Sequence, residues 1–275
     1  LAGGIIAVAI ALIFFFSTLL DWGSKFLPFS YEQQAAAPLV EKYLTEFPNE
    51  SKMIDSYLQQ LADNIVPLMA LDGDMSITLH YVNLDTVNGM ATLGGNIFIF
   101  RGLLEKLPNE NALVMLLAHE IAHVKLRHPV KALSKGVLIS LMLAIVSGQN
   151  NTDVSGLLAG TSQLAFLGFS RAQEQDADAQ ATQLNQHYYH HTQGAIDLFK
   201  VLLAESESES ISSLSLFNSH PNIGERINTV IKTSQINQWP TRGVVIEIPD
   251  EIKQQLIDER LKQAQAEHQD TKKPT

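Results

Sequence analysis

Two histidines and a glutamate within five consecutive residues have the types and spacing for metal chemistry. His119, Glu120 and His123 form an H-E-x-x-H sequence inside the stretch 109–126, whose pattern indicates a helix. Residues four apart share one face of a helix, about 5–6 Å apart at Cβ, so both histidines can direct ring nitrogens at one metal ion. Glu120 is turned about 100° away and can take a proton from a water molecule on that metal. The motif therefore predicts metal-assisted hydrolysis with Glu120 as general base.

The residues around the motif indicate that its helix is buried. They are apolar on nearly every side: Leu113, Val114, Leu116, Leu117, Ile121, Ala122 and Val124. A buried His-Glu-His group needs a partner that offsets its lost hydration. The alternative is a chance spacing, since the chain contains 9 histidines. The buried context favours the metal site.

A carboxylate-rich segment further along offers a third ligand. The chain has no cysteine, so a zinc site with two histidines needs a third histidine or a carboxylate. Glu174 and Asp178 are four apart and share one helix face. Glu174 is our candidate ligand, and Asp178 can accept the second ring N–H of a ligand histidine and fix its tautomer. The alternative is a solvated acidic face.

Composition limits the classes of partner. The 275 residues, 45% of them hydrophobic, can form one large domain or two small ones. The formal net charge is −10 and the sequence has no basic stripe, which argues against nucleic acid as a partner.

The first twenty residues predict a membrane anchor. Residues 1–20 contain no charged side chain, and about 20 apolar residues are needed to cross a bilayer. We predict one transmembrane helix there, followed by a linker at residues 21–29; the alternative is a buried core helix. The chain begins with Leu rather than Met, which indicates a fragment or a processed product. The apolar run 137–146 is too short for a second span and predicts a buried or membrane-facing helix.

Glycines and alternating residues indicate a small sheet before the metal helix. Residues 76–82 alternate as a strand does, and two further strand-like pieces in 88–100 meet at a Gly-Gly turn. An edge strand of this kind can bind a peptide as an added strand, while the alternative is an ordinary hairpin with a bulge. The histidine- and tyrosine-rich residues 187–191 predict a surface turn, and the alternative is a cluster that binds metal adventitiously. Residues 243–248 predict another strand, and 250–266 a charged helix before a disordered tail.

Three sequence blocks in order carry a family resemblance. They are H-E-x-x-H at 119–123, S-R-x-x-E-x-x-A-D at 170–178, and S-H-P at 219–221 with Arg226-Ile227. Over about residues 30–231 the chain resembles the membrane-associated zinc metallopeptidases of the HtpX and CAAX prenyl endopeptidase (Ste24-like) superfamily, in its singly anchored bacterial type. The resemblance implies one Zn²⁺ per chain bound by His119, His123 and Glu174. Glu120 is then the general base, and Asp178 supports the ligands.

The resemblance also assigns residues around the cleft. It implies that His220 and Arg226 lie near it; from the residues alone, His220 can stabilise an oxyanion, occupy an open zinc position or cap a helix. The segment 88–99 resembles the family's cleft-edge strand, although the proline usual before the paired glycines is Leu93 here. The substrate-binding candidates in this segment are Asn88, Ala91, Gly94 and Gly95.

The predicted fold is α+β. It consists of a mainly helical zincin-like metalloprotease domain at residues 30–249 with a small sheet at the cleft edge, preceded by the transmembrane helix and followed by the helix and tail at 250–275. The predicted function is a single-pass, membrane-anchored zinc endopeptidase that acts on misfolded or envelope proteins in protein quality control, with its catalytic domain on the periplasmic side. The competing hypothesis is a chaperone-like assembly factor whose zinc domain mainly binds clients; an intact Glu120 disfavours it.

Overall fold

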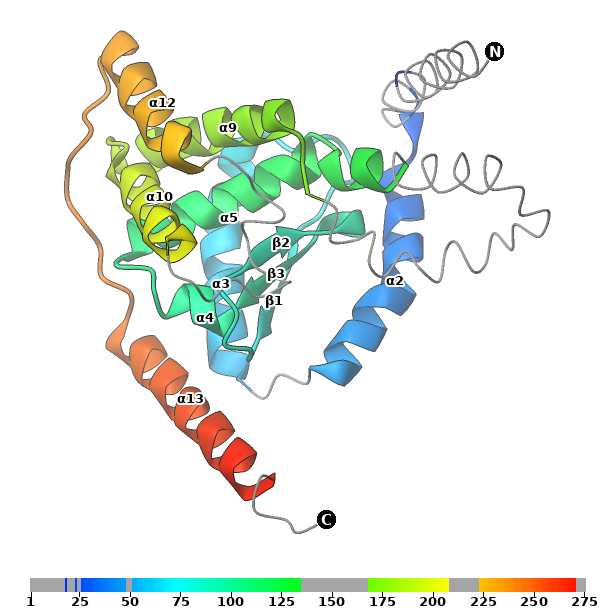
Figure 1. The fold of residues 1–275 in the computed structure, drawn as a ribbon. Helices are drawn as coiled ribbons and strands as arrows, with labels where there is room; N and C mark the ends of the chain where they lie inside the picture. Colours follow the sequence, from blue (N-terminus) through cyan, green and yellow to red (C-terminus); the bar gives the residue numbers. More distant parts are fainter. Residues whose placement is uncertain are drawn as a thin grey trace, which may run out of the picture.

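The computed structural model describes residues 18, 23, 26–47, 51–134, 168–207 and 223–270, with side chains up to residue 265 (Figure 1). The predicted span at residues 1–20, apart from Thr18, lies outside this part of the chain, as do the apolar run 137–146 and His220. Within the described residues, none of the helices has the length and apolar character needed to cross a membrane.

A three-stranded mixed sheet lies near the middle of the molecule (Figure 1). Its strands are β1 (Thr78–Val82), β2 (Gly89–Ala91) and β3 (Asn96–Phe100), in the order β1-β3-β2. β3 pairs in parallel with β1 and antiparallel with β2. A short 3-10 turn, η3 (Leu93–Gly95), joins β2 to β3. The three strands predicted between residues 76 and 100, and the glycine turn between the last two, are confirmed.

Helices cover both faces of the sheet because the strands direct apolar side chains to both faces. One face packs on α3 (Lys52–Ile65) and α5 (Glu110–Lys125) through Leu79, Tyr81, Ala91, Ile97 and Ile99. The other face packs on α2 (Phe29–Glu46) through Val82, Met90, Phe98 and Phe100. The side chains of α3 also occupy the outer edge of β1, where Asp55 and Gln59 accept the N–H groups of Tyr81 and Leu79. Consequently β2 is the sheet edge that no described helix caps in this way.

The metal helix α5 runs through the centre of the helical half (Figure 1). Asn109 caps it by accepting the N–H of Ala112 at 2.8 Å, and all residues from Asn111 to Val124 are buried. α9 (Arg171–Tyr189) and α10 (Gln193–Ser206) lie along it. A capping box fixes the start of α9, since Ser170 and Gln173 bond reciprocally.

Four further elements of the described residues are the short helices η2 (Val66–Met69) and α4 (Arg101–Leu104) and the C-terminal helices α12 (Ile223–Ile236) and α13 (Asp250–Asp270). Residues 128–134, after α5, are also helical. Between α12 and α13, residues 239–249 run as an extended segment along the side of the domain (Figure 1).

Three sequence-based expectations about this C-terminal half are wrong. Residues 243–248 are not a strand, because their backbone bonds to the start of α5 instead of to a strand: Ile246 accepts from the N–H of Glu110 and donates to Asn111. His191 is not a surface residue; it is 3% exposed and its Nε2 lies 2.9 Å from the carbonyl oxygen of Val244. The last helix continues to Asp270, beyond the predicted end at 266.

Candidate metal centre

Three ligand atoms from α5 and α9 converge on one point. Nε2 of His119 and Nε2 of His123 are 3.0 Å apart, and the carboxylate oxygens of Glu174 lie 3.6 Å and 3.4 Å from them, respectively. All three side chains are buried. The two histidines meet because they are one turn apart on α5, and Glu174 reaches them because the first turn of α9 crosses that face of α5.

The spacing of these atoms fits zinc. Tetrahedral Zn²⁺ with bonds of about 2.0–2.2 Å holds its ligand atoms about 3.3–3.6 Å apart. The measured separations of 3.0, 3.4 and 3.6 Å are close to that range. Two imidazoles and a carboxylate, without a thiolate, form a donor set of the catalytic kind, in which the fourth position stays open to water or substrate. The residues therefore fit the predicted metal.

Asp178 controls the tautomer of His119. Its Oδ1 lies 3.0 Å from Nδ1 of His119, so this nitrogen carries the proton and Nε2 keeps its lone pair for the metal. Burial alone would raise the pKa of Asp178, but the hydrogen bond from His119 and the charge of Arg226 outweigh burial and hold that pKa below its usual range. Asp178 is therefore a charged acceptor in the folded protein.

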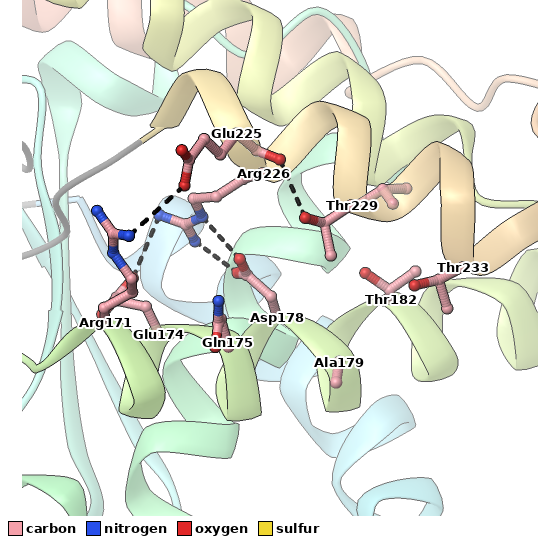
Figure 2. A pocket seen from close by; sticks show the side chains of 11 residues that line it. Arg171, Glu174, Gln175, Asp178, Ala179, Thr182, Glu225, Arg226, Thr229 and Thr233 are labelled. Atoms are coloured by element: carbon pink, nitrogen blue, oxygen red, sulfur yellow. Dashed lines mark hydrogen bonds and ion pairs between the residues drawn. The ribbon is translucent and has the colours of Figure 1, made fainter.

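Arg226 of α12 joins the two carboxylates of α9. Figure 2 shows its guanidinium between Glu174 and Asp178. Nε donates to Asp178 at 2.7 Å, Nη2 forms a second bond to the same carboxylate, and Nη1 lies 3.2 Å from Oε2 of Glu174. The guanidinium also lies over the ring of Phe199, 4.4 Å from its centroid. Arg226 thus neutralises charge behind the ligands and fixes the orientation of Glu174.

Comparisons with known proteins agree with this geometry. The model of the family described as "Peptidase family M48" matches residues 55–234. The chain belongs to peptidase family M48. The predicted class, a metallopeptidase, is confirmed, while the HtpX or Ste24-like branch stays a prediction.

Several named relatives are similar to this M48 chain. A "Beta-barrel assembly-enhancing protease" of Yersinia pestis is 31% identical over 160 residues, which are 54% of this chain and 30% of the relative. The protein of that name in Escherichia coli is 35% identical over 108 residues, 35% of this chain and 22% of the relative. The "Mitochondrial metalloendopeptidase OMA1" of Schizosaccharomyces pombe is 26% identical over 208 residues, 73% of this chain and 60% of the relative. The matches thus span less than two thirds of each relative.

Glu120, the predicted general base, is a buried carboxylate beside the ligand histidines in sequence. It follows His119 directly on α5, is fully buried, and its helical position turns it to a different side from the two ligand histidines. Its carboxylate is thereby shielded from bulk solvent. Its role as the general base stays a prediction.

The cleft-edge candidates of the M48 domain fall into two groups. Asn88 and Ala91 lie on or beside β2 and are buried. Gly94 and Gly95 lie beyond the strand, under α2, with φ of 68° and 79°. A Cβ at Gly95 would come 1.9 Å from the carbonyl oxygen of Ser76. These two glycines therefore allow other backbone segments of the same chain to pack closely against them. Their predicted contact with a substrate stays a prediction.

One contact in the M48 site was not predicted from the sequence. Nδ1 of His128 lies 2.8 Å from Nδ1 of His123, and His128 is 2% exposed. The ring of Phe169 stacks on His123, with centroids 3.9 Å apart. The only sequence signal was a histidine five residues after the last motif histidine, and that spacing does not return to the same helix face.

A small cavity of about 80 Å³ adjoins the metal centre between α9 and α12 (Figure 2). Glu174, Asp178 and Arg226 form its inner wall, and Thr182, Thr229 and Thr233 extend it outward. It is large enough for a few water molecules next to the carboxylates. The predicted position of His220, in contrast, lies outside the described residues.

Proposed function

We propose that this M48 chain is a zinc-dependent endopeptidase in which Glu120 activates the attacking water. The observation that carries the proposal is the convergence of His119, His123 and Glu174 at tetrahedral spacing, with Glu120 adjacent on the same buried helix. Zinc, when bound, supplies a Lewis acid that polarises the scissile carbonyl and lowers the pKa of water.

The chain's own residues carry the remaining steps. Glu120 accepts the proton of the attacking water and returns it to the leaving amine, which needs a carboxylate held close to the reacting atoms. Asp178 keeps the proton of His119 on Nδ1, 3.0 Å away, and Arg226 holds Glu174 from behind at 3.2 Å. The burial of these groups strengthens each electrostatic contact because water is excluded.

The substrate backbone lies along β2 in this proposal. Asn88 and Thr92 bond to Phe100 and Asn96 of β3. Because hydrogen-bonded and non-bonded pairs alternate in an antiparallel ladder, the N–H and C=O groups of Gly89 and Ala91 face away from β3. A peptide added as a strand would bond to these groups, and α5 lies next to β2.

For substrates we propose misfolded or envelope proteins near a membrane. The support is the charge-free segment 1–20 together with relatives whose names include "beta-barrel assembly-enhancing protease" and "mitochondrial metalloendopeptidase". Anchoring through residues 1–20 and a periplasmic catalytic domain belong to the same proposal. A tether of this kind raises the effective concentration of the site at the bilayer surface.

A chelation experiment tests the proposal. The purified full chain, loaded with zinc, is incubated with an unfolded protein, and new amino termini are counted with and without a chelator. We expect cleavage that stops on chelation and returns when zinc is added back. A loaded chain that binds unfolded protein without cleaving it would replace the endopeptidase proposal with the chaperone-like one.

A further inference from the structure

His128 lies in a position to decide the proton arrangement of a metal ligand. Its Nδ1 is 2.8 Å from Nδ1 of His123. Both residues are buried, His128 with 2% and His123 with 0% of its surface exposed. We propose that His128 is a positioning residue that accepts the Nδ1 proton of His123 and thereby directs the lone pair of Nε2 of His123 toward zinc. This inference rests on the proposed zinc site.

One hydrogen lies between the Nδ1 atoms of His123 and His128. At 2.8 Å a single proton is shared, because two N–H groups facing each other would repel. A metal-bound imidazole must present an unprotonated nitrogen, and Nε2 of His123 is the atom that faces His119 and Glu174. The proton of His123 therefore sits on Nδ1, and Nδ1 of His128 is the acceptor. His128 is then neutral, with its own proton on Nε2.

The two ligand histidines thus have different acceptors. His119 donates to the carboxylate of Asp178, which also accepts from Arg226. His123 donates to a neutral imidazole instead. An outer acceptor of either kind orients the ligand ring and raises its basicity, and its loss typically weakens metal binding about 10- to 100-fold. His128 therefore does for His123 what Asp178 does for His119.

Two features hold His128 in place. α5 ends at Lys125, and Arg127 adopts a left-handed conformation with φ of 60°, which turns the chain back toward the helix. The Arg127 side chain is fixed by Glu32, 2.6 Å away on α2, and by the carbonyl oxygen of Leu27. The ring of Phe169 stacks on His123 and tilts against His128, 5.9 Å away. The position of His128 is thus fixed by the contacts of Arg127, which precedes it, and by the ring of Phe169.

The first experiment measures zinc affinity of the full chain by competition with a chelator of known affinity. His128→Leu keeps an apolar side chain but removes the acceptor, whereas His128→Asn places a carbonyl oxygen near the position of Nδ1. We expect the leucine variant to bind zinc about 10- to 100-fold more weakly and the asparagine variant to recover most of that loss. His187→Leu, on the exposed side of α9, is the matched control and should bind as the parent does.

The second readout is spectroscopic and needs no activity. With Co²⁺ in place of zinc, the visible spectrum of His128→Leu should differ from the parent, and that of His128→Asn should resemble it. Chains labelled with ¹⁵N-histidine and loaded with zinc should show His128 with its proton on Nε2, which tests the inference in the parent protein even where a variant fails to fold.

Three results would contradict the positioning role of His128. Parent-like zinc affinity in His128→Leu, equal losses in the leucine and asparagine variants, or a His128 proton on Nδ1 would each overturn the positioning role. A parent chain that binds no zinc would instead overturn the proposed function itself, and the two failures are thereby separated.

Discussion

Asp178 and Glu174 lie one turn apart on α9 and meet opposite nitrogens of the same imidazole. Asp178 is 3.0 Å from Nδ1 of His119, and Glu174 is 3.6 Å from its Nε2. The i,i+4 spacing aligns both carboxylates on one helix face, so that in the proposed zinc site Glu174 completes the ligand set and Asp178 sets the tautomer of His119. Arg226 ties them together from α12.

The first prediction concerns the base. Glu120→Gln keeps the size of the side chain but cannot accept a proton, so the rate of peptide cleavage should fall about 10²- to 10⁴-fold. Both ligand histidines stay in place, so zinc content should match that of the parent. Metal analysis alongside a cleavage assay checks both statements. Normal turnover in this variant would remove Glu120 from the mechanism.

The second prediction separates ligand from support on α9. Glu174→Ala should lose bound zinc, because two histidines alone leave the metal with only two protein ligands. Asp178→Ala should still bind zinc, about 10- to 100-fold more weakly. Asp176→Ala, exposed on the same helix, is the control and should bind normally. Equal zinc binding by Glu174→Ala and the parent would contradict the ligand assignment.

How well the site could be predicted from the sequence depended on whether the geometry of a single helix fixes the residues concerned. His119, Glu120 and His123 could be placed because one helix fixes their geometry, and the spacing of Glu174 and Asp178 worked in the same way. His128 could not, because its contact depends on the left-handed residue before it.

Long-range contacts were equally hidden. Residues 243–248 were predicted to form a strand, yet among the described residues no strand pairs with them; Ile246 bonds to the start of α5 instead. His191 was predicted to be a surface residue because it adjoins another histidine in a tyrosine-rich turn, but the same extended segment covers it. Both errors have one cause, which is that pairing partners more than fifty residues away leave no local pattern.

The third prediction tests β2 as the substrate edge. The N–H of Ala91 faces away from β3, so Ala91→Pro removes a donor to the substrate without removing a ladder hydrogen bond. We expect a higher KM with zinc content unchanged. Thr92→Pro is the matched change, because the N–H of Thr92 donates to Asn96 at 2.7 Å, and it should lower the free energy of unfolding instead. Equal KM values in Ala91→Pro and the parent would argue against strand addition at β2.

The fourth prediction is a pH dependence of stability at Glu32. Burial raises the pKa of Glu32, and the charge of Arg127 and the N–H of Gly94 only partly offset it. The folded chain then keeps the proton at a pH at which the unfolded chain has released it. This contribution is complete below the ordinary pKa of 4.5 and is lost as pH rises through the raised value.

Denaturant titrations against a variant without this group measure the effect. The difference in unfolding free energy between the parent and Glu32→Gln should fall as pH rises from 4.5. The same comparison can be made with Arg127→Met added to both chains. The difference should then fall more steeply with pH, because the Glu32 carboxylate is left buried without its cation. A difference that grows with pH would mean that the ion pair, not burial, dominates at this position.

The last prediction concerns where the catalytic domain can be separated from its proposed anchor. The sequence suggested a boundary at residue 30, but Phe29 is 1% exposed in the core, Arg127 lies over its ring, and Leu27 accepts a hydrogen bond from Arg127. A chain starting at Phe26 should therefore fold and cleave an unfolded soluble protein. A chain starting at residue 30 should lose stability comparable to a buried Phe→Ala change, about 3–5 kcal/mol. Phe29→Ala in the longer chain is the matched control, because it should reproduce most of that loss while keeping the Leu27 contact. Thermal unfolding of the three chains checks this, and equal stability of the two truncated chains would show that the fold begins after Phe29.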